Sequence, residues 1–253
     1  MSKLVTRRMV LAGAAGLGGM ATIAGFEGGR LTDGVRMASD ALTIRTQRIL
    51  LRRRPLVREF GAADISSVFP TNGTTVPAGP EYQSHASVGF RDWALRIDGL
   101  VQKPLRLTLP ELARLESRKQ VTMHCCDEGW SAIAEWKGVP LGSLLTLIGL
   151  LPGAQYVVFH CLDKKEEDGR MYYESLDLFD AFHPQTILAY EMNGRPLPVN
   201  YGAPLRLRVE TQIGYKNAKY IDRLEIVDRL DRLGSGRGGW WEDFDDALWY
   251  AGQ

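Results

Sequence analysis

The sequence predicts an α+β protein, and three observations support this class. Short segments in which apolar and polar residues alternate, as in half-buried strands, are interspersed with short segments of helical periodicity. The 253 residues are 45% hydrophobic and 24% charged, which is the composition of a globular protein with a substantial core. A G-x-x-x-x-G-K phosphate loop is absent, which argues against a nucleotide-binding α/β fold.

The first 26 residues resemble an export signal. Thr6, Arg7 and Arg8 are followed by Leu11, and residues 9–26 carry no charge and are rich in glycine and alanine. This arrangement resembles a twin-arginine signal, which belongs to a route that exports already folded, often cofactor-loaded proteins. We therefore expect export to the periplasm. An ordinary secretory signal and a plain membrane anchor are the alternatives.

Residues 27–60 are expected to form a helical or linker segment. Met37, Ala41 and Ile44 recur at helical spacing. Three arginines at positions 52–54 follow at the end of this pattern, where cations complement the helix dipole. A solvated helix end is the simpler interpretation of these arginines, and contact with an anionic surface is the alternative.

Residues 61–253 are expected to form one domain of alternating strands and helices. Its first part, residues 61–89, is rich in Gly, Pro, Ser and Thr and should be loop. Apolar residues alternate or form short runs in the expected strands, at residues 93–98, 105–109, 121–125, 156–159 and 205–209. Helices are expected from the capping box of Thr108 and Glu111, and over residues 140–148, where apolar side chains share one face.

Charge and cysteine content exclude several classes of protein. The formal net charge is +1, from 31 Lys+Arg against 30 Asp+Glu, which argues against a nucleic-acid binder held by bulk electrostatics. Three cysteines are too few for a disulfide framework. Because their number is odd, at least one thiol should be free, metal-bound or catalytic.

The densest polar cluster contains His124, Cys125, Cys126, Asp127 and Glu128. It follows an apolar strand, so it should lie in a loop at a strand end, where functional residues are common. A thiolate here could be a nucleophile, half of a vicinal disulfide or a soft metal ligand. A zinc site is disfavoured because no second Cys/His pair stands at ligand spacing. Two buried structural cysteines are the alternative.

A second, basic cluster lies far downstream. Arg206 and Arg208 should share one face of a strand, and Lys216 and Lys219 follow in a turn that begins at Gly214. Guanidinium and ammonium groups beside backbone N–H groups make a good phosphate site. A solvated basic face is the alternative.

Several motifs appear in a specific order along the chain. Residues 121–131 and 136–141 combine the adjacent cysteines with Trp130 and Trp136. Shorter motifs are Phe69-Pro70-Thr71-Asn72-Gly73, Tyr173-Glu174-Ser175-Leu176, His183-Pro184-Gln185-Thr186, Met192-Asn193-Gly194 and Gly202-Ala203-Pro204-Leu205-Arg206. Together they resemble the sulfite-oxidase-type family of molybdopterin-binding oxidoreductases over residues 60–253. Within it, the chain is most similar to the exported catalytic subunits of periplasmic protein-methionine-sulfoxide reductases.

The resemblance implies a mixed-sheet, sulfite-oxidase-like fold with a single catalytic domain over residues 61–253, and Mo-molybdopterin as cofactor. It implies that Cys126, four residues before Trp130, is the metal ligand and the catalytic residue, because a soft thiolate suits this metal. The other implied cofactor contacts are Asn72, Cys161, Tyr201, Arg206, Asn217, Ala218 and Lys219. The relative has Thr in place of Cys161 and Asn in place of Tyr201.

The implied activity is two-electron oxygen-atom transfer by an exported molybdenum oxidoreductase. Sulfite is an anion, and sulfite oxidases of the family carry arginines just after the ligand cysteine, where this chain has Asp127 and Glu128. Reduction of a neutral S-oxide or N-oxide, such as free or protein-bound methionine sulfoxide, is therefore favoured over sulfite dehydrogenation. A non-enzymatic cofactor-binding protein and a thiol redox protein using Cys125 and Cys126 are the alternatives from other classes.

Electrons should come from a separate partner, because the chain has no C-x-x-C-H haem motif and no flavin or nicotinamide signature. The resemblance implies that this partner is a membrane cytochrome. A monomer is the default expectation. His124 and His183 are candidates to line the site, and positions in the core are the alternative for both.

Overall fold

The computed structural model describes residues 28–53 and 55–252. The export signal expected over residues 1–26 lies outside the described residues. The chain divides into two compact units, residues 1–47 and residues 48–253, and all the described strands belong to the second unit. Among the described helices, none combines the length and apolar character that a membrane span requires.

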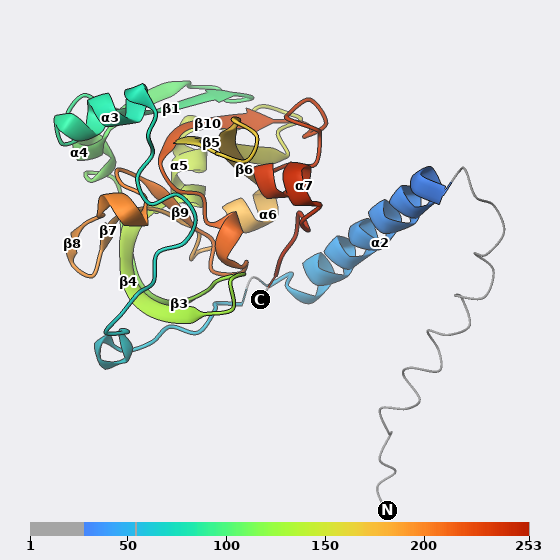
Figure 1. The fold of residues 1–253 in the computed structure, drawn as a ribbon, viewed down its shortest axis with the longest axis horizontal. Coiled ribbons are helices and arrows are strands. Elements are labelled where there is room, and N and C mark those ends of the chain that lie inside the picture. Colours follow the sequence, from blue (N-terminus) through green and yellow to red (C-terminus); the bar gives the residue numbers. More distant parts are fainter. Residues whose placement is uncertain (1–27, 54, 253) are drawn as a thin grey trace, which may run out of the picture. The chain divides into compact units, whose positions relative to one another are not determined.

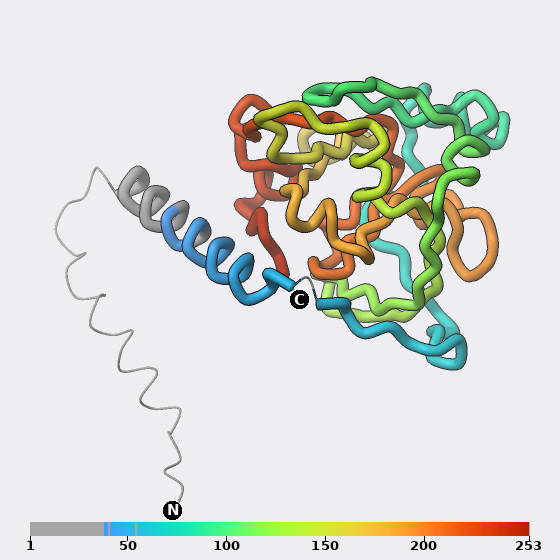
Figure 2. The backbone as a smooth tube through the Cα atoms, turned by 180° about the vertical axis from the view of Figure 1, so that it is seen from behind, coloured from blue at the N-terminus to red at the C-terminus, as the bar shows by residue number. Residues whose placement is uncertain are grey.

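Helix α2 (Gly28–Leu50) is the first described element. Arg48 lies in its last turn and belongs to the second unit, where its guanidinium donates hydrogen bonds to the carboxylates of Asp177 and Asp180. The C-terminal segment of the chain returns to the start of this unit, where the ring of Tyr250 lies 4.6 Å from the Arg48 guanidinium (Figure 2).

The first sheet is mixed, as the resemblance implies. Its strand order is β2 (Leu105–Thr108), β1 (Ala94–Gly99), β10 (Ile221–Val227), β5 (Tyr156–Lys164), β6 (Met171–Asp177). Strands β1 and β10 pair in parallel, and the other neighbours pair antiparallel (Figure 1). Strand β1 shows the expected alternation, since Leu95 and Ile97 are buried and Arg96 is exposed.

The second sheet is antiparallel and carries both polar clusters. Strands β3 (Arg118–Cys125) and β4 (Ser131–Pro140) form a long curved hairpin (Figure 1). Strand β4 also pairs with β7 (Ile187–Met192), and β7 pairs with both β8 (Arg195–Pro196) and β9 (Arg206–Arg208). The cysteine cluster thus spans the end of β3 and the loop after it, and the basic cluster spans β9 and the turn after it.

The helices of the second unit are short. They are α3 (Pro80–Ser87), α4 (Leu109–Leu112), α5 (Leu141–Ile148), α6 (Leu178–Ala181) and α7 (Trp240–Asp245), with 3₁₀ turns η1 (Ala62–Asp64), η2 (Val199–Tyr201) and η3 (Gly214–Lys216). Part of the capping box that is expected to open α4 is present. The Glu111 carboxylate accepts the Thr108 N–H at 2.8 Å, and the Thr108 side chain makes no capping hydrogen bond.

The expectation that residues 61–89 are entirely loop is wrong, because α3 lies within them. Pro80 occupies its first turn, where the missing N–H costs nothing. Tyr82 then buries its ring completely and donates its hydroxyl to the carbonyl of Ala203 at 2.8 Å. This long-range contact favours a helix that local composition does not predict.

Buried apolar side chains form two clusters. The larger one packs the first sheet against α5, with Trp93, Leu144 and Phe159 fully buried. The smaller one surrounds Trp136 on β4 and includes Ala189 of β7. A fully buried large apolar side chain contributes about 1.5–3 kcal/mol to folding, so these clusters hold the two sheets as one framework for the polar residues.

Candidate functional site

Cys126 begins a tight loop between β3 and β4. The Cys126 N–H donates to the Trp130 carbonyl at 2.9 Å, and the Gly129 N–H donates to the Cys126 carbonyl at 3.1 Å. Gly129 has a φ of 89°, a conformation that glycine adopts without strain. The β3–β4 hairpin therefore fixes the position of the Cys126 side chain, which is only 8% exposed.

The turn that follows β9 meets this loop directly. A Cβ atom added at Gly214 would lie 3.1 Å from the Cα of Cys126 and 3.3 Å from the carbonyl oxygen of Cys125. A Cβ at this position would fit only if the neighbouring atoms shifted by a few tenths of an ångström. The two polar clusters that are far apart in the sequence are thus in backbone contact.

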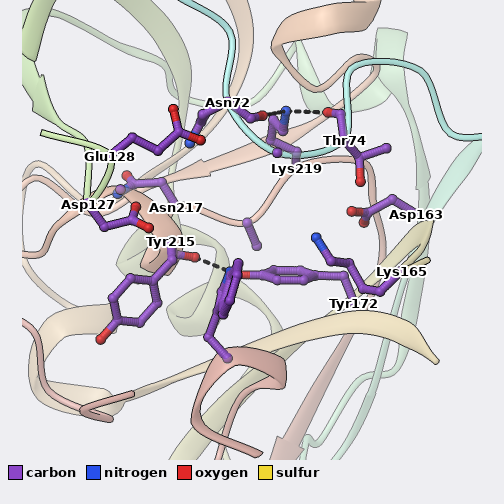
Figure 3. A pocket seen from close by; sticks show the side chains of 14 residues that line it. Asn72, Thr74, Asp127, Glu128, Asp163, Lys165, Tyr172, Tyr215, Asn217 and Lys219 are labelled. Carbon is purple, nitrogen blue, oxygen red and sulfur yellow. Dashed lines mark hydrogen bonds between the residues drawn. The ribbon is translucent and has the colours of Figure 1, made fainter. Parts of the chain in front are cut away.

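A pocket opens where the two segments meet (Figure 3). Asp127 and Glu128 lie on one side of it, and Asp163 and Lys165 lie opposite (Figure 3). The described residues that line it are Asn72, Gly73, Thr74, Asp127, Glu128, Asp163, Lys165, Tyr172, Gly214, Tyr215, Asn217, Ala218, Lys219 and Trp241. Asn72, Asn217, Ala218 and Lys219, four of the residues predicted to bind the cofactor, therefore share this pocket.

Lys219 is a cation with little compensating charge. Its ammonium donates to the main-chain carbonyls of Asn72, at 2.7 Å, and of Thr74. Burial, and then the positive charge of Arg206, lower the pKa of Lys219 from 10.5 to about 7. An anion bound in the pocket would raise the pKa of Lys219 again and keep its ammonium in the charged form.

Arg206 is a second buried cation beside Lys219. It is 2% exposed, donates to the carbonyls of Tyr201 (2.9 Å) and Asn217 (3.4 Å), and has no carboxylate partner among the described residues. Its Nε atom is buried without any hydrogen-bond partner in the described part of the chain. Burial and the nearby Arg208 lower the pKa of Arg206 to about 9. Such a guanidinium can donate a hydrogen bond to an acceptor that does not belong to the chain, such as a bound anion.

The two adjacent thiols have different surroundings. The Cys126 thiol accepts from the side-chain amide of Asn72 at 3.7 Å and donates to the Asp127 carboxylate at 3.6 Å. Burial, reinforced by the neighbouring carboxylates, raises the pKa of Cys126 to about 11. Burial also raises the pKa of Cys125, which instead interacts electrostatically with Arg208 and Glu210.

These raised pKa values bear on the alternative of a thiol redox protein. A redox thiol needs a substantial thiolate fraction near neutral pH, and both thiols are shifted the other way. Cys125, Cys126 and Cys161 are all free thiols. Coordination to a metal would displace the Cys126 proton directly, so the raised pKa does not oppose a role as metal ligand.

Four of the residues predicted to bind the cofactor are not among those that line the pocket: Cys126, Cys161, Tyr201 and Arg206. Cys161 is 4% exposed within the larger apolar cluster, and complete burial raises its pKa strongly. Tyr201 donates its hydroxyl to the Phe69 carbonyl at 2.7 Å and reaches the site only through its carbonyl, which accepts from Arg206.

Other members of the two polar clusters are engaged in the interior. Arg208 is 1% exposed, pairs with Glu210 at 2.6 Å and donates to Nδ1 of His124 at 2.8 Å. Lys216 is fully buried between Glu174 and Glu242. The interpretation of a solvated basic face is therefore wrong, and Lys216 is not available for a phosphate.

The two histidine candidates also have structural partners. Arginine only donates, so His124 accepts at Nδ1 and carries its proton on Nε2. His183 lies between the Pro55 carbonyl and the Gln185 N–H, both at 3.2 Å, and does not line the pocket.

Sequence reasoning missed one wall of the pocket. Asp163, Lys165 and Tyr172 come from the end of β5, the following turn and β6, and Trp241 comes from α7. The Lys165 ammonium lies 5.6 Å from the ring centroid of Trp241. Strand β5 was expected to end at residue 159 but continues to Lys164, and this extension carries Asp163 to the pocket.

The donor set fits an anionic cofactor that brings its own metal. The unpartnered Arg206 Nε and the undercompensated Lys219 ammonium suit a phosphate, and the Cys126 thiol suits a soft metal. Among residues 28–53 and 55–252, no group of three or more His, Cys, Asp or Glu could hold a metal ion by itself.

Comparison with known proteins agrees with this donor set. The oxidoreductase molybdopterin binding domain matches residues 82–232, which is more than half of the chain. A protein of Azospira oryzae, provisionally named protein-methionine-sulfoxide reductase subunit YedZ1, is 38% identical over 200 residues, covering 76% of this chain and 70% of that protein.

Two named catalytic subunits are also similar. The protein-methionine-sulfoxide reductase catalytic subunits MsrP of Xanthomonas campestris and Gluconobacter oxydans are 35% and 36% identical over 147 residues, or 54% of this chain. The chain spans less than half of their length, 46% and 47%. The sulfane dehydrogenase SoxCD of Paracoccus pantotrophus has a TM-score of 0.49 at 24% identity, over 59% of this chain and 45% of that one. By the domain match and the Azospira relative, this chain belongs to the family of oxidoreductases with a molybdopterin-binding domain.

Proposed function

We propose that this chain is an exported molybdenum–molybdopterin oxidoreductase that reduces an S-oxide, such as methionine sulfoxide, or an N-oxide. One observation carries the proposal: the close approach of Gly214 to Cys126 places this cysteine beside the pocket that Asn72 and the Asn217-Ala218-Lys219 turn line. A soft metal ligand and a phosphate site are thereby placed at the two ends of one binding region.

Each residue of the region has a distinct part in binding. Cys126 would ligate the metal, and Asn72, which contacts its sulfur, would fix the orientation of that thiolate. Arg206 and Lys219, together with the N–H groups of the turn, would hold the phosphate. When bound, molybdopterin supplies a two-electron redox centre able to take an oxygen atom from the substrate.

The charge near Cys126 supports a neutral oxide as substrate. Asp127 and Glu128 line the pocket beside the cysteine, and the described residues that line it include no arginine. Carboxylates repel the sulfite anion but not an uncharged sulfoxide. Reduction of a sulfoxide consumes two electrons and two protons and releases the thioether and water. Methionine sulfoxide, free or within a protein, fits the names of the MsrP relatives.

The electrons would come from a separate membrane cytochrome, and the protein would work in the periplasm after export by the twin-arginine route. Three features support this part of the proposal. The sequence carries Arg7 and Arg8 before an uncharged stretch, it lacks a haem motif of its own, and its relatives are named as subunits.

The decisive experiment compares the two adjacent cysteines. In Cys126→Ser, we expect loss of sulfoxide reduction and of the thiolate-to-metal absorption band, because a hydroxyl is a harder and far less acidic ligand. Cys125→Ser is the matched control, because it makes the same substitution at the adjacent cysteine, whose surroundings differ from those of Cys126. It should retain molybdenum, colour and most activity, measured with a reduced viologen dye as electron donor.

Each other outcome excludes part of the proposal. Loss of activity in Cys125→Ser alone would move the metal ligand by one residue. A wild-type protein, isolated after export, that contains no molybdenum by elemental analysis would refute the assignment of this cofactor and favour the non-enzymatic or thiol redox alternative.

A further inference from the structure

We propose that the surface formed by Ile49, Leu50, Arg52 and Arg53 binds an anionic lipid membrane. Ile49 and Leu50 are adjacent large aliphatic residues, 73% and 72% exposed. They share a surface hollow with exposed Arg52 and Arg53, and these four are the described residues that line it. We call these four residues the basic–apolar patch.

The charge around the basic–apolar patch has one sign. Residues 48–58 contain five arginines and no acidic residue. Arg48 is already paired with Asp177 and Asp180, so it anchors the segment to the rest of the unit. Among the described residues, Arg52 and Arg53 have no carboxylate partner, so their charges are available to an external anion.

The combination of exposed aliphatic and guanidinium groups fits a lipid surface better than a purely anionic ligand. Entry of Ile49 and Leu50 into the boundary between headgroups and acyl chains would lower the free energy, because their apolar surface would leave water. A free phosphate or a nucleic-acid backbone has no such apolar layer. Arg52 and Arg53 would bind the lipid phosphates at the same depth. The rival occupant is an acidic protein surface.

This surface is separate from the pocket and goes beyond the proposed function. None of the four residues lines the pocket beside Cys126. Membrane binding and oxide reduction should therefore be separable by mutation. If the electron donor is a membrane protein, as proposed above, binding at this surface would raise the concentration of the enzyme near that donor.

The test is flotation of the full-length, cofactor-loaded protein with vesicles. Vesicles of phosphatidylglycerol mixed with phosphatidylcholine should bind the protein, and binding should weaken as salt is raised, whereas pure phosphatidylcholine should bind it poorly. Each arginine near an anionic surface strengthens binding by about fivefold, so Arg52→Gln with Arg53→Gln should weaken it about thirtyfold. Ile49→Ser with Leu50→Ser should weaken binding to the anionic vesicles at every salt concentration.

The matched control is Arg106→Gln with Arg114→Gln, which removes the same charge from two exposed arginines elsewhere. This control should bind vesicles like the wild type, and all three double variants should retain dye-driven sulfoxide reduction. Equal flotation of the wild type and the Arg52/Arg53 variant would overturn the proposal. So would equal losses in the Arg52/Arg53 variant and the control, because the effect would then be one of net charge. Vesicle binding unaffected by the Ile49/Leu50 change would also overturn it, because binding would then rest on charge alone. Failure of the wild type to float with anionic vesicles would overturn it as well and favour an acidic protein surface.

Discussion

Lys216 and Glu242 form an ion pair inside the protein, with Nζ and Oε1 2.7 Å apart and both side chains excluded from solvent. The same ammonium also donates to Glu174. Burial and the charge of Glu242 raise the pKa of Glu174 well above its ordinary value, while Lys216 opposes this shift. One lysine thus ties the turn η3 to strand β6 and helix α7, directly behind the pocket.

Lys216→Met should destabilise the protein strongly. Its removal leaves two buried carboxylates facing each other, and breaking a buried pair in this way typically costs about 3–5 kcal/mol. Urea denaturation would measure the loss. Lys119→Met is the matched control, since Lys119 is 61% exposed in its pair with Glu135 and an exposed pair contributes at most about 1 kcal/mol. Similar unfolding free energies for the two variants would show that the buried pair contributes no more to stability than the exposed pair.

Lys216 also shows where the sequence misleads. It stands three residues before Lys219 in one turn, and local spacing therefore assigns both lysines to a phosphate site. The structure separates them, because Lys216 meets carboxylates from β6 and α7 whose approach is set by long-range packing. Which of two neighbouring cations is neutralised depends on partners that sequence periodicity does not specify.

The fold was predictable in class and in most strands, because alternation of apolar residues reports burial on one face. Helix α3 was missed, because Tyr82 is held by Ala203, far away in the sequence. Asn72, Asn217, Ala218 and Lys219 were identified by motif resemblance and do share a pocket. Trp241 and Lys165 were not identified, because no local pattern distinguishes a pocket wall from any other partly buried position.

Arg206→Ala should yield a folded protein with little bound pterin. Arg206 has an unpartnered Nε and no carboxylate partner among the described residues, so its burial is costly unless an anion is bound. Each charge-assisted hydrogen bond it donates to a phosphate contributes about 1.5–3 kcal/mol. Fluorescence of the oxidised pterin released from purified protein would measure occupancy, and circular dichroism would confirm folding. Full occupancy would place the phosphate clamp elsewhere.

Gly214→Ala should reduce cofactor occupancy without removing any side chain that binds it. The new Cβ would lie about 3.0 Å from the Asp127 carboxylate and 3.1 Å from the Cys126 Cα, so we expect the carboxylate and the loop to shift by a few tenths of an ångström. Gly61→Ala is the matched control, because Gly61 has a φ of −83° and its added Cβ would meet only the Asp64 carboxylate, at 3.5 Å. Both variants should fold, but only Gly214→Ala should lower the ratio of molybdenum to protein. Equal metal content in the two variants would show that close contact at Gly214 is not needed.

Arg7→Lys combined with Arg8→Lys should leave the protein in the cytoplasm. A twin-arginine signal depends on the paired guanidinium groups, which lysine replaces poorly because it lacks their planar donor geometry. Immunoblotting of periplasmic and cytoplasmic fractions would measure export. An unchanged periplasmic yield would refute the twin-arginine assignment.

The stability of the cofactor-free protein should rise with pH above neutrality because of Lys219. Its pKa is about 7 when folded and near 10.5 when unfolded, mainly because burial penalises the charged form. Between these two values the unfolded chain binds a proton at Lys219 that the folded chain has lost, so raising the pH favours the folded state. Urea denaturation across this window should therefore show the wild type gaining stability relative to Lys219→Met.

With the cofactor bound, its phosphate should keep Lys219 charged, and the gain should be smaller. Parallel pH profiles of the wild type and Lys219→Met in the cofactor-free state would show that the ammonium is not penalised, and would remove the main electrostatic argument for a phosphate at this position.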